Sequence, residues 1–290
     1  MTGVLTDLHV HLRPDDLDAS ASEHFSAANA ERYRAAARER GIEELGVSEH
    51  IYRFTQALEV WRHPFWQQYA HDDLDEYCAF VRGHTDLRLG IEADFVAGAE
   101  EQTAALLAAR DFDYVVGSVH FLRDGAVDME DFSVWEPRAG LSAEQVWAAY
   151  FETVAQSARS GLFDVIAHPD LVKYWGQPGR TPAGDLRRYY ETAVSAFAES
   201  GVAVELSTAG LRKPAGELYP APAFLQMCVE AGVPVALSSD AHRPEDLGYG
   251  YEQALHLLDR LDVRELCVFE HRTRSLRALA RAPSEEASAS

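Results

Sequence analysis

The sequence predicts an α/β fold in which strands and helices alternate around a single-domain barrel. Short β-type segments and helical segments alternate about seven times along 290 residues, as in repeated βαβ units. Strand segments such as Val-Ala-Val-Glu-Leu are almost continuously apolar, which is typical of strands covered on both faces. A doubly wound sheet usually carries a glycine-rich loop after its first strand, whereas this chain has His-Leu-Arg-Pro there.

The first half of the chain supplies four strands and three helices. The helix at 29–40 is rich in Ala, Glu and Arg and is followed by Gly41, the residue type that most often ends a helix. The segment before residue 120 reads Tyr-Val-Val-Gly-Ser-Val, a strongly β-forming run. The expected elements are strand 4–10, helix 29–40, strand 44–48, helix 73–82, strand 87–91, helix 100–110 and strand 114–119.

The second half continues the alternation. Its longest helix, 142–160, begins with Ser142 as N-cap and Gln145 at the third helical position, the pattern of a capping box. The expected elements are helix 142–160, strand 163–167, helix 185–200, strand 202–206, helix 221–231, strand 233–237, a mainly helical segment 244–261 and a last short strand 266–269. No shift in composition marks a linker, so we expect one domain over 1–280 and a disordered polar tail at 281–290.

The chain is strongly acidic, with 26 Lys and Arg against 47 Asp and Glu and a formal charge of −21. A field of this sign repels nucleic acid and anionic membranes, so we expect neither as a partner. Bound metal ions would offset this negative field locally, so that a phosphorylated substrate could bind. The three cysteines are widely spaced, and no apolar run approaches the length of a membrane span. These features predict a cytoplasmic protein; they do not indicate its oligomeric state.

Residues that bind metals follow the predicted strands. His9 and His11 are two positions apart, so on a strand they point to the same side. A single histidine at a strand end is usually only a polar loop residue. Here, however, six strand ends carry such residues, and in a parallel barrel these ends share one face, where active sites lie. The residues are His9, His11, His50, Glu92, His120, His168, Asp240 and His242.

This set of side chains indicates a hydrolytic metal site. Imidazole and carboxylate without thiolate suit zinc, iron or manganese, and the number of ligands implies two or three divalent ions. We expect Glu92 to bridge two ions, which would hold a hydroxide between them. In the amidohydrolase class a carboxylated lysine bridges the ions, but the first lysine of this chain is Lys173, far beyond that position.

These motifs resemble the polymerase and histidinol phosphatase (PHP) family, and most closely its histidinol-phosphatase branch. The resemblance runs from Asp7 to about Gly250 and implies a distorted (β/α)7 barrel, TIM-like, with a trinuclear metal site. It rests on Asp7-Leu-His-Val-His11, Glu49-His50, Gly90-Ile-Glu-Ala-Asp94, Gly117-Ser-Val-His120, His168-Pro-Asp170, Ser207-Thr-Ala-Gly-Leu-Arg-Lys-Pro214, Tyr219-Pro-Ala-Pro222 and Ser239-Asp-Ala-His242.

The resemblance also implies a set of ligands for each ion. The first ion takes His9, His11, Glu92 and Asp240, and the second takes Glu92, His120 and His168. The third takes His50, His242 and a ligand from the loop after His11. Relatives often place His or Asp six residues after the second histidine, where this chain has Leu17, so Asp15 and Asp16 are the nearest substitutes.

The implied activity is hydrolysis of L-histidinol phosphate to L-histidinol and phosphate, a step of histidine biosynthesis, by attack of the metal-bridged hydroxide. We expect Arg212 to contact the phosphate, because an arginine fork matches its oxygens. Arg53 and Lys213 are further pocket candidates, and Asp240 or Asp170 could protonate the leaving alkoxide. Two alternatives remain: a phosphoesterase of this family acting on another small phosphate ester or a nucleotide, and a metal-binding protein without enzymatic activity.

Overall fold

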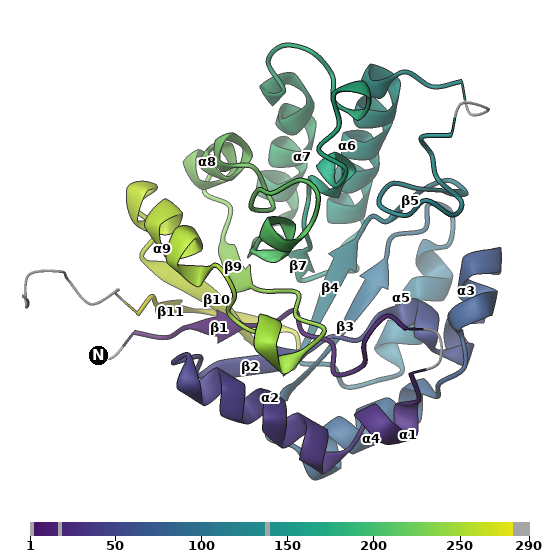
Figure 1. Ribbon diagram of the computed structural model, residues 1–290, viewed down its shortest axis with the longest axis vertical. Coiled ribbons are helices and arrows are strands. Elements are labelled where there is room, and N and C mark those ends of the chain that lie inside the picture. Colours follow the sequence, from purple (N-terminus) through teal and green to yellow (C-terminus); the bar gives the residue numbers. More distant parts are fainter. Residues whose placement is uncertain (1–2, 17–18, 137–139, 281–290) are drawn as a thin grey trace, which may run out of the picture.

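Seven parallel strands form a nearly closed barrel surrounded by helices (Figure 1). The computed structural model describes residues 3–16, 19–136 and 140–280, so the predicted tail at 281–290 lies outside the described residues. The strand order is β1-β2-β3-β4-β7-β8-β9, and each neighbouring pair in this order is parallel. A bridge between Val10 and Ala241 joins the two ends of the sheet, and the predicted barrel is thereby confirmed.

The strands of the barrel are β1 Thr6–Asp7, β2 Glu44–Val47, β3 Arg88–Asp94, β4 Tyr114–Ser118, β7 Val165–Ile166, β8 Ala203–Ser207 and β9 Val235–Ser238. Two antiparallel hairpins lie outside this sheet: β5 Phe121–Leu122 with β6 Gly125–Ala126, and β10 Glu265–Glu270 with β11 Thr273–Ala278. The helices are α1 Ala21–His24, α2 Ala27–Glu39, α3 Pro64–Tyr69, α4 Leu74–His84, α5 Glu100–Ala108, α6 Ala143–Arg159, α7 Arg187–Ser200, α8 Pro222–Glu230 and α9 Tyr251–Arg260. None of the helices in the described parts of the chain is long and apolar enough to span a membrane.

Several predicted boundaries are confirmed by local chemistry. The capping box at the start of α6 is present, since Ser142 Oγ accepts from Gln145 N and the Gln145 side chain accepts from Ser142 N. Helix α2 ends just before Gly41, whose φ of +69° is the left-handed conformation that glycine adopts without steric cost.

Other boundaries were wrong. Only two residues of the predicted strand 4–10 pair as a strand, and only two of 163–167 do. Glu92 does not follow its strand but lies within β3. By contrast, the mainly helical segment predicted over 244–261 is confirmed as two pieces, a 3-10 helix at Pro244–Asp246 and helix α9, which Gly248 and Gly250 separate with φ values of +64° and +70°. The last predicted strand, 266–269, is confirmed within β10, which pairs with β11 in a hairpin outside the barrel.

The interior of the barrel has an apolar floor. The Tyr114 ring fills the space beside two glycines: a Cβ at Gly46 would lie 2.3 Å from the Tyr114 hydroxyl, and one at Gly90 would lie 2.4 Å from Cζ. Below it, Cys267 and Phe269 of β10 pack with the interior residues of the barrel, and the rings of Phe269 and Tyr114 are 6.2 Å apart. Hairpin β10–β11 therefore seals the amino end of the barrel.

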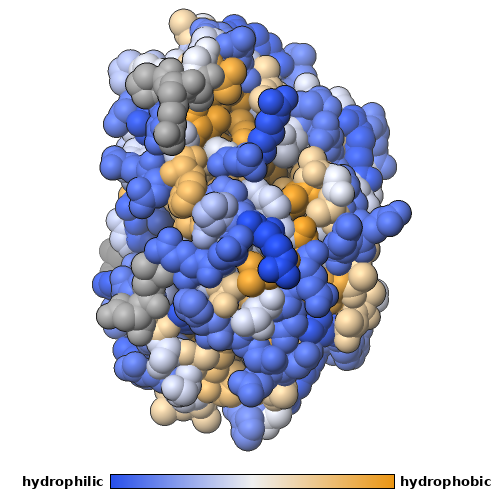
Figure 2. All heavy atoms as spheres, turned by 90° about the vertical axis from the view of Figure 1, so that its right-hand side faces the viewer, coloured by the Kyte–Doolittle hydropathy of each residue, from blue (hydrophilic) through white to orange (hydrophobic). Residues whose placement is uncertain are grey.

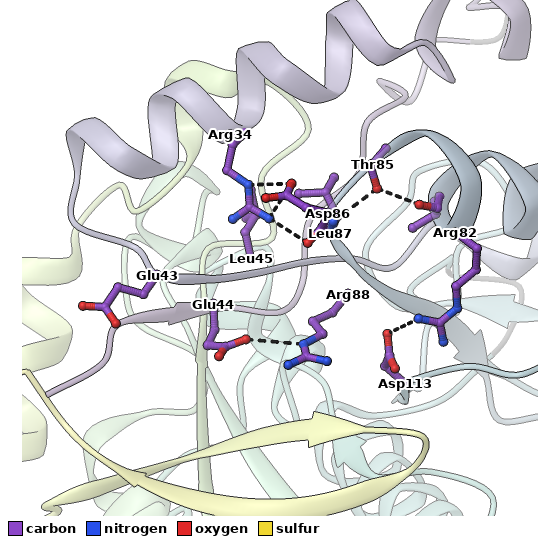
Figure 3. Close-up of a pocket in the computed structure, with 11 residues that line it drawn as sticks. Arg34, Glu43, Glu44, Leu45, Arg82, Thr85, Asp86, Leu87, Arg88 and Asp113 are labelled. Carbon is purple, nitrogen blue, oxygen red and sulfur yellow. Dashed lines mark hydrogen bonds and ion pairs between the residues drawn. The ribbon is translucent and has the colours of Figure 1, made fainter.

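The amino end also carries a polar pocket of about 360 Å³, lined by the starts of β2 and β3. Its charges pair with one another (Figure 3): Arg34 with Asp86, Arg88 with Glu44 and Arg82 with Asp113. Asp113 is buried and accepts from Arg82 Nη1 at 2.8 Å and from Leu89 N at 2.9 Å. These pairings tie α2 and α4 to the strands, and polar contacts at the amino end of a barrel commonly serve stability rather than catalysis.

The outer surface is mostly hydrophilic. Figure 2 shows polar side chains over most of the face seen, with apolar side chains gathered in small separate patches. Among the described residues the exposed large hydrophobic side chains are Leu141, Tyr249 and Leu276, which are scattered singly along the chain. The large apolar residues therefore form the barrel interior and the layer between strands and helices.

Candidate metal centre

The polar upper layer of the barrel begins where the apolar floor ends. Side chains two apart on a strand point to the same side, so Gly90, Glu92 and Asp94 of β3 all face the interior. Glycine at the floor makes room for Tyr114, and the two carboxylates above it reach the carboxyl end of the barrel. Glu92 is buried and lies at the centre of the histidine cluster.

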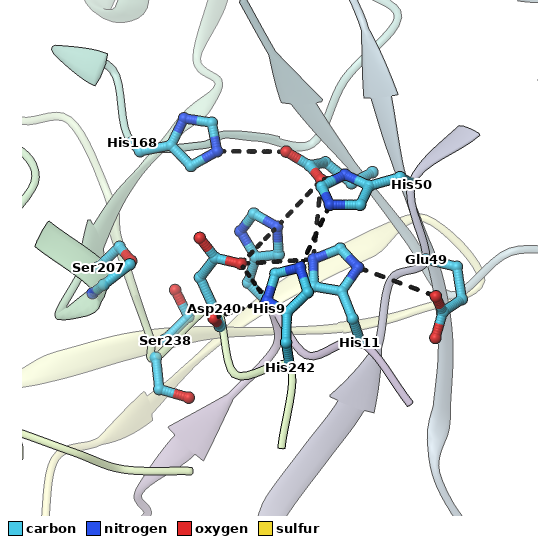
Figure 4. Close-up of polar contacts among 12 residues, drawn as sticks. His9, His11, Glu49, His50, His168, Ser207, Ser238, Asp240 and His242 are labelled. Atoms are coloured by element: carbon cyan, nitrogen blue, oxygen red, sulfur yellow. Dashed lines mark hydrogen bonds and ion pairs between the residues drawn. The ribbon is translucent and has the colours of Figure 1, made fainter. Parts of the chain in front are cut away.

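Four atoms form the first group: one from Glu92 of β3 and three from His9, His11 and Asp240, which follow β1 and β9 and point toward one another in Figure 4. Glu92 Oε2 lies 3.4 Å from His9 Nε2 and 3.7 Å from His11 Nε2. Asp240 Oδ1 lies 3.9 Å from His9 Nε2 and 3.4 Å from His11 Nε2. Ligands about 2.0–2.2 Å from a tetrahedral ion are roughly 3.3–3.6 Å from one another, so these separations match a site for one divalent ion.

The other oxygen of Glu92 faces a second group. Glu92 Oε1 lies 3.2 Å from His168 Nε2 and 3.6 Å from His120 Nε2. The two oxygens of one buried carboxylate thus point to two different sets of imidazoles. This is the arrangement expected of a bridging ligand.

The third group contains the acidic loop residue Asp15. His50 Nε2 and His242 Nε2 are 3.3 Å apart, and the carboxylate of Asp15 lies 3.5 Å from the first and 3.2 Å from the second. The ring of His11 stacks on both histidines, at 4.1 and 4.2 Å. Asp16 is exposed, and its backbone carbonyl accepts from Ala19 N. Of the two predicted substitutes, the structure therefore brings Asp15 to the cluster.

The donor atoms of this cluster fit metal ions because many of them lack a hydrogen-bond partner, although Glu92 Oε2 is also in ion-pair contact with His50 Nδ1. Six buried atoms have no hydrogen-bond partner among the described residues: His9 Nε2, His11 Nδ1, His11 Nε2, Glu92 Oε2, His168 Nδ1 and Asp240 Oδ1. Each unpaired buried polar atom costs about 1–3 kcal/mol. Four of the six are the atoms of the first group, where an ion would satisfy them together.

Charge and burial act on the protonation of the cluster in opposite directions. Burial raises the pKa of Glu92, but His50, His9 and His120 outweigh it and hold the pKa well below its usual value. Burial, with the neighbouring His50 and His242, holds the pKa of His11 well below its usual value. These interactions favour the ionised form of Glu92 and the neutral form of His11, which are the forms that bind metal, whereas, against the effect of burial, the neighbouring carboxylates raise the pKa of His50 to about 9 and that of His120 to about 10.

Carboxylates behind the cluster orient its imidazoles, and sequence reasoning did not assign them this role. Glu205 Oε1 accepts from His9 Nδ1 at 2.8 Å, and its Oε2 accepts from His168 N at 2.6 Å. Asp94 Oδ1 accepts from His120 Nδ1 at 2.7 Å. These bonds leave Nε2 of His9 and His120 facing Glu92. The available signal was a lone glutamate in the apolar strand 202–206.

The backbone is strained at two cluster residues. His168 has a φ of +25° and Asp240 a φ of +51°, values that non-glycine residues rarely adopt. At His168 the bond from its N–H to Glu205 holds the strained conformation. At Asp240 the Nη2 of Arg212 donates to the carbonyls of Ser239 and Asp240, at 2.8 and 3.0 Å. Each strained residue is thus fixed by a charged side chain.

The residues predicted to contact the substrate or to protonate the leaving group have different surroundings in the structure. Arg212 supports the Asp240 segment, with its Nη1 buried and without a hydrogen-bond partner among the described residues. Lys213 lines the cavity above the cluster. Arg53 is buried and donates to Glu49 Oε2 at 3.0 Å and to Asp15 Oδ1 at 2.6 Å, so it fixes the loop that carries Asp15. Asp170 is buried and pairs with Lys173 at 2.8 Å, whereas Asp240 lines the cavity.

A cavity of about 260 Å³ opens above the predicted metal ligands. Its other walls are largely aromatic and come from η1 Ile51–Arg53, α3, the β5–β6 hairpin and η4 Leu171–Lys173 with their flanking residues. Tyr52, Phe65 and Tyr69 pack together at ring distances of 4.5–5.6 Å and form one wall. The cavity lining combines a charged floor with apolar sides, as small-molecule sites commonly do.

Comparison with known proteins finds relatives of this chain that are named as phosphatases. A family model for the PHP domain matches residues 7–209. A protein of Deinococcus radiodurans named "Probable histidinol-phosphatase" is 33% identical over 279 residues, which cover 94% of this chain and 98% of that protein. The histidinol-phosphatase of Bacillus subtilis is 26% identical over 252 residues, covering 80% of this chain and 94% of that protein.

A solved structure has a similar fold. The crystal structure of histidinol phosphate phosphatase from Lactococcus lactis, complexed with zinc, L-histidinol and phosphate, superposes with a TM-score of 0.64 at 15% identity. The superposition covers 93% of this chain and 99% of that chain.

Proposed function

This chain belongs to the PHP domain family, and from that membership we propose that it hydrolyses L-histidinol phosphate to L-histidinol and phosphate. The main support for a hydrolytic activity is that three groups of potential metal-binding side chains meet around Glu92 and His11. The substrate follows the names of relatives that align over most of this chain.

We assign the ligands to three ions by the groups that the side chains form. The first ion would be held by His9, His11, Glu92 and Asp240, and the second by Glu92, His120 and His168. The third would be held by His50, His242 and Asp15. Divalent ions in such a site lower the pKa of water toward neutrality and neutralise phosphoryl oxygens.

The side chains of the protein bind and orient the ester. Lys213 in the cavity wall and the unpartnered Nη1 of Arg212 are the cationic donors proposed for the phosphate oxygens. The carboxylate at the cavity surface is Asp240, the one of the two candidates that can approach the leaving alkoxide, since Asp170 is buried against Lys173. The aromatic wall limits access of bulk water to the reacting group.

The test is phosphate release by purified protein loaded with zinc or manganese. We expect kcat/KM to be higher for L-histidinol phosphate than for glycerol phosphate or a nucleoside monophosphate. His9→Ala should abolish turnover, whereas the exposed His71→Ala should leave it unchanged. Preference for the nucleotide would assign a different substrate, and no turnover of any ester by the metal-loaded protein would reject the enzymatic function.

A further inference from the structure

The cavity above the ligand groups contains very little charge beyond them. Outside the proposed ligands, its lining in the described parts of the chain is aromatic or apolar except for two side chains, Asp128 and Lys213. One is an anion and the other a cation. The carboxylate of Asp128 is required neither for hydrolysis nor for binding of the metal ions.

Asp128 lies just after hairpin β5–β6, on a segment that packs against the cavity. Its Oδ1 is buried and has no hydrogen-bond partner among the described residues. Burial raises the pKa of Asp128, and His120, His168 and Lys213 offset this only in part. A buried carboxylate oxygen without a donor is unfavourable unless a ligand supplies one, and a cationic donor in the cavity would satisfy both the hydrogen bond and the charge.

The neighbouring rings suit the same ligand. Tyr52, Phe65 and Tyr69 form one wall, and Tyr174 and Tyr219 also line the cavity. Aromatic faces attract cations and stack on flat heterocycles. The wall can thus hold the organic part of a cationic ester while its charged group reaches a carboxylate.

We propose that Asp128 is a specificity-determining residue that receives the ammonium group of the substrate and selects phosphate esters of amino alcohols over those of neutral alcohols. This assignment rests on the proposed phosphatase function and adds the feature of the alcohol that the site recognises. Asp128 and Lys213 then present opposite charges to one ligand, Lys213 attracting its phosphate and Asp128 its amine. Complementary charges of this kind fix the orientation of a bound molecule.

The test compares two esters that differ only in the amine. Metal-loaded wild type and Asp128→Asn are assayed with L-histidinol phosphate and with its deamino analogue, 3-(imidazol-4-yl)propyl phosphate. We expect the ratio of the two kcat/KM values to fall about 10- to 100-fold in Asp128→Asn, the range for loss of a hydrogen bond to a charged group. Glu130→Gln removes an exposed carboxylate two residues away and should keep the wild-type ratio.

Inhibition constants separate binding of the amine from binding of the phosphate. In Asp128→Asn the inhibition constant of L-histidinol should rise by a similar factor, while that of inorganic phosphate should not change. Equal loss of kcat/KM for both esters would overturn the assignment and indicate a structural or proton-transfer role. Unaltered preference for the amino ester would also overturn it.

Failure of the underlying function gives a different result. If the wild type itself prefers the deamino ester, both the substrate and the Asp128 assignment fall. If the wild type prefers L-histidinol phosphate and Asp128→Asn keeps that preference, only the Asp128 assignment falls. Metal content and thermal unfolding of Asp128→Asn, measured beside the wild type, identify any loss that comes from misfolding.

Discussion

Glu205 and His9 are joined by a hydrogen bond of 2.8 Å between Oε1 and Nδ1, deep inside the barrel. The same carboxylate accepts from the backbone N–H of His168 and from the hydroxyl of Ser238. One side chain of β8 therefore fixes residues that follow β1 and β7 and the last residue of β9. Its position explains how imidazoles from separate strands converge on Glu92.

We expect Glu205→Gln to lower metal affinity or kcat/KM about 10- to 100-fold, the usual effect of losing a carboxylate behind a metal-binding histidine. The amide keeps the shape of the side chain but cannot accept every bond that the carboxylate accepts. Metal content by elemental analysis and phosphate release measure the effect. Glu199→Gln, at an exposed pair with Arg159, is the control, and equal behaviour of the two variants would contradict the orienting role.

Metal binding should stabilise the fold, because it satisfies buried atoms that otherwise lack partners. A chelator should abolish activity reversibly. Adding zinc or manganese to metal-free protein at about 100 times the dissociation constant should stabilise it by about 2.7 kcal/mol. For a chain of 290 residues that corresponds to a rise in Tm of about 4–5 °C by calorimetry. The rise should shrink in His120→Ala and persist in His71→Ala; a metal-independent Tm in the wild type would reject the centre.

Gly90→Ala should destabilise the protein by about 1–3 kcal/mol, the usual cost of overpacking a core. The added methyl would lie 2.4 Å from the ring of Tyr114, which is buried and cannot withdraw. Chemical unfolding measures the difference. Gly83→Ala in α4 meets no atom within 4 Å and should stabilise the protein by up to about 1 kcal/mol. Similar effects of both substitutions would show that the fit against Tyr114 is not tight.

Asp113 should contribute to stability in a pH-dependent way. Burial raises the pKa of Asp113, but hydrogen bonds from Arg82 and from the N–H groups of Leu89 and His271 outweigh it, and the pKa is lowered from 3.8. The contribution is therefore present above the unfolded pKa of 3.8 and is lost as the pH falls through the lower folded value. Wild type should exceed Asp113→Asn by about 1–2 kcal/mol near pH 6 and approach it in acid. A difference that grows on acidification would contradict the sign.

The sequence predicted the barrel and the cluster because both depend on local patterns. Nearly continuous apolar segments identify strands with two covered faces, and histidines placed just after them must meet at one end of a parallel barrel. The structure brings all eight predicted ligand side chains together, and Asp15 with them. That each one binds an ion stays a prediction.

The features of the structure that could not be predicted from the sequence depend on contacts between segments that are distant along the chain. Hairpin β5–β6 has two residues per strand, too few for a periodic pattern, so the place of Asp128 could not be predicted. β11 is exposed along its whole length and carries no apolar alternation. Arg212 and Lys213 are adjacent in sequence, and only the fold shows that Arg212 supports the Asp240 segment while Lys213 lines the cavity.

The seal that hairpin β10–β11 forms at the amino end of the barrel determines where substrate can enter and products can leave. With Phe269 and Tyr114 closing the floor, the barrel is a blind-ended cup. Substrate and both products then share one mouth, beside Tyr52 and Tyr174. With the ester bound as proposed, its phosphate would lie deepest, at the predicted metal ligands, and its amino alcohol above it. The alcohol would then leave first, and phosphate retained below would compete with the next substrate molecule.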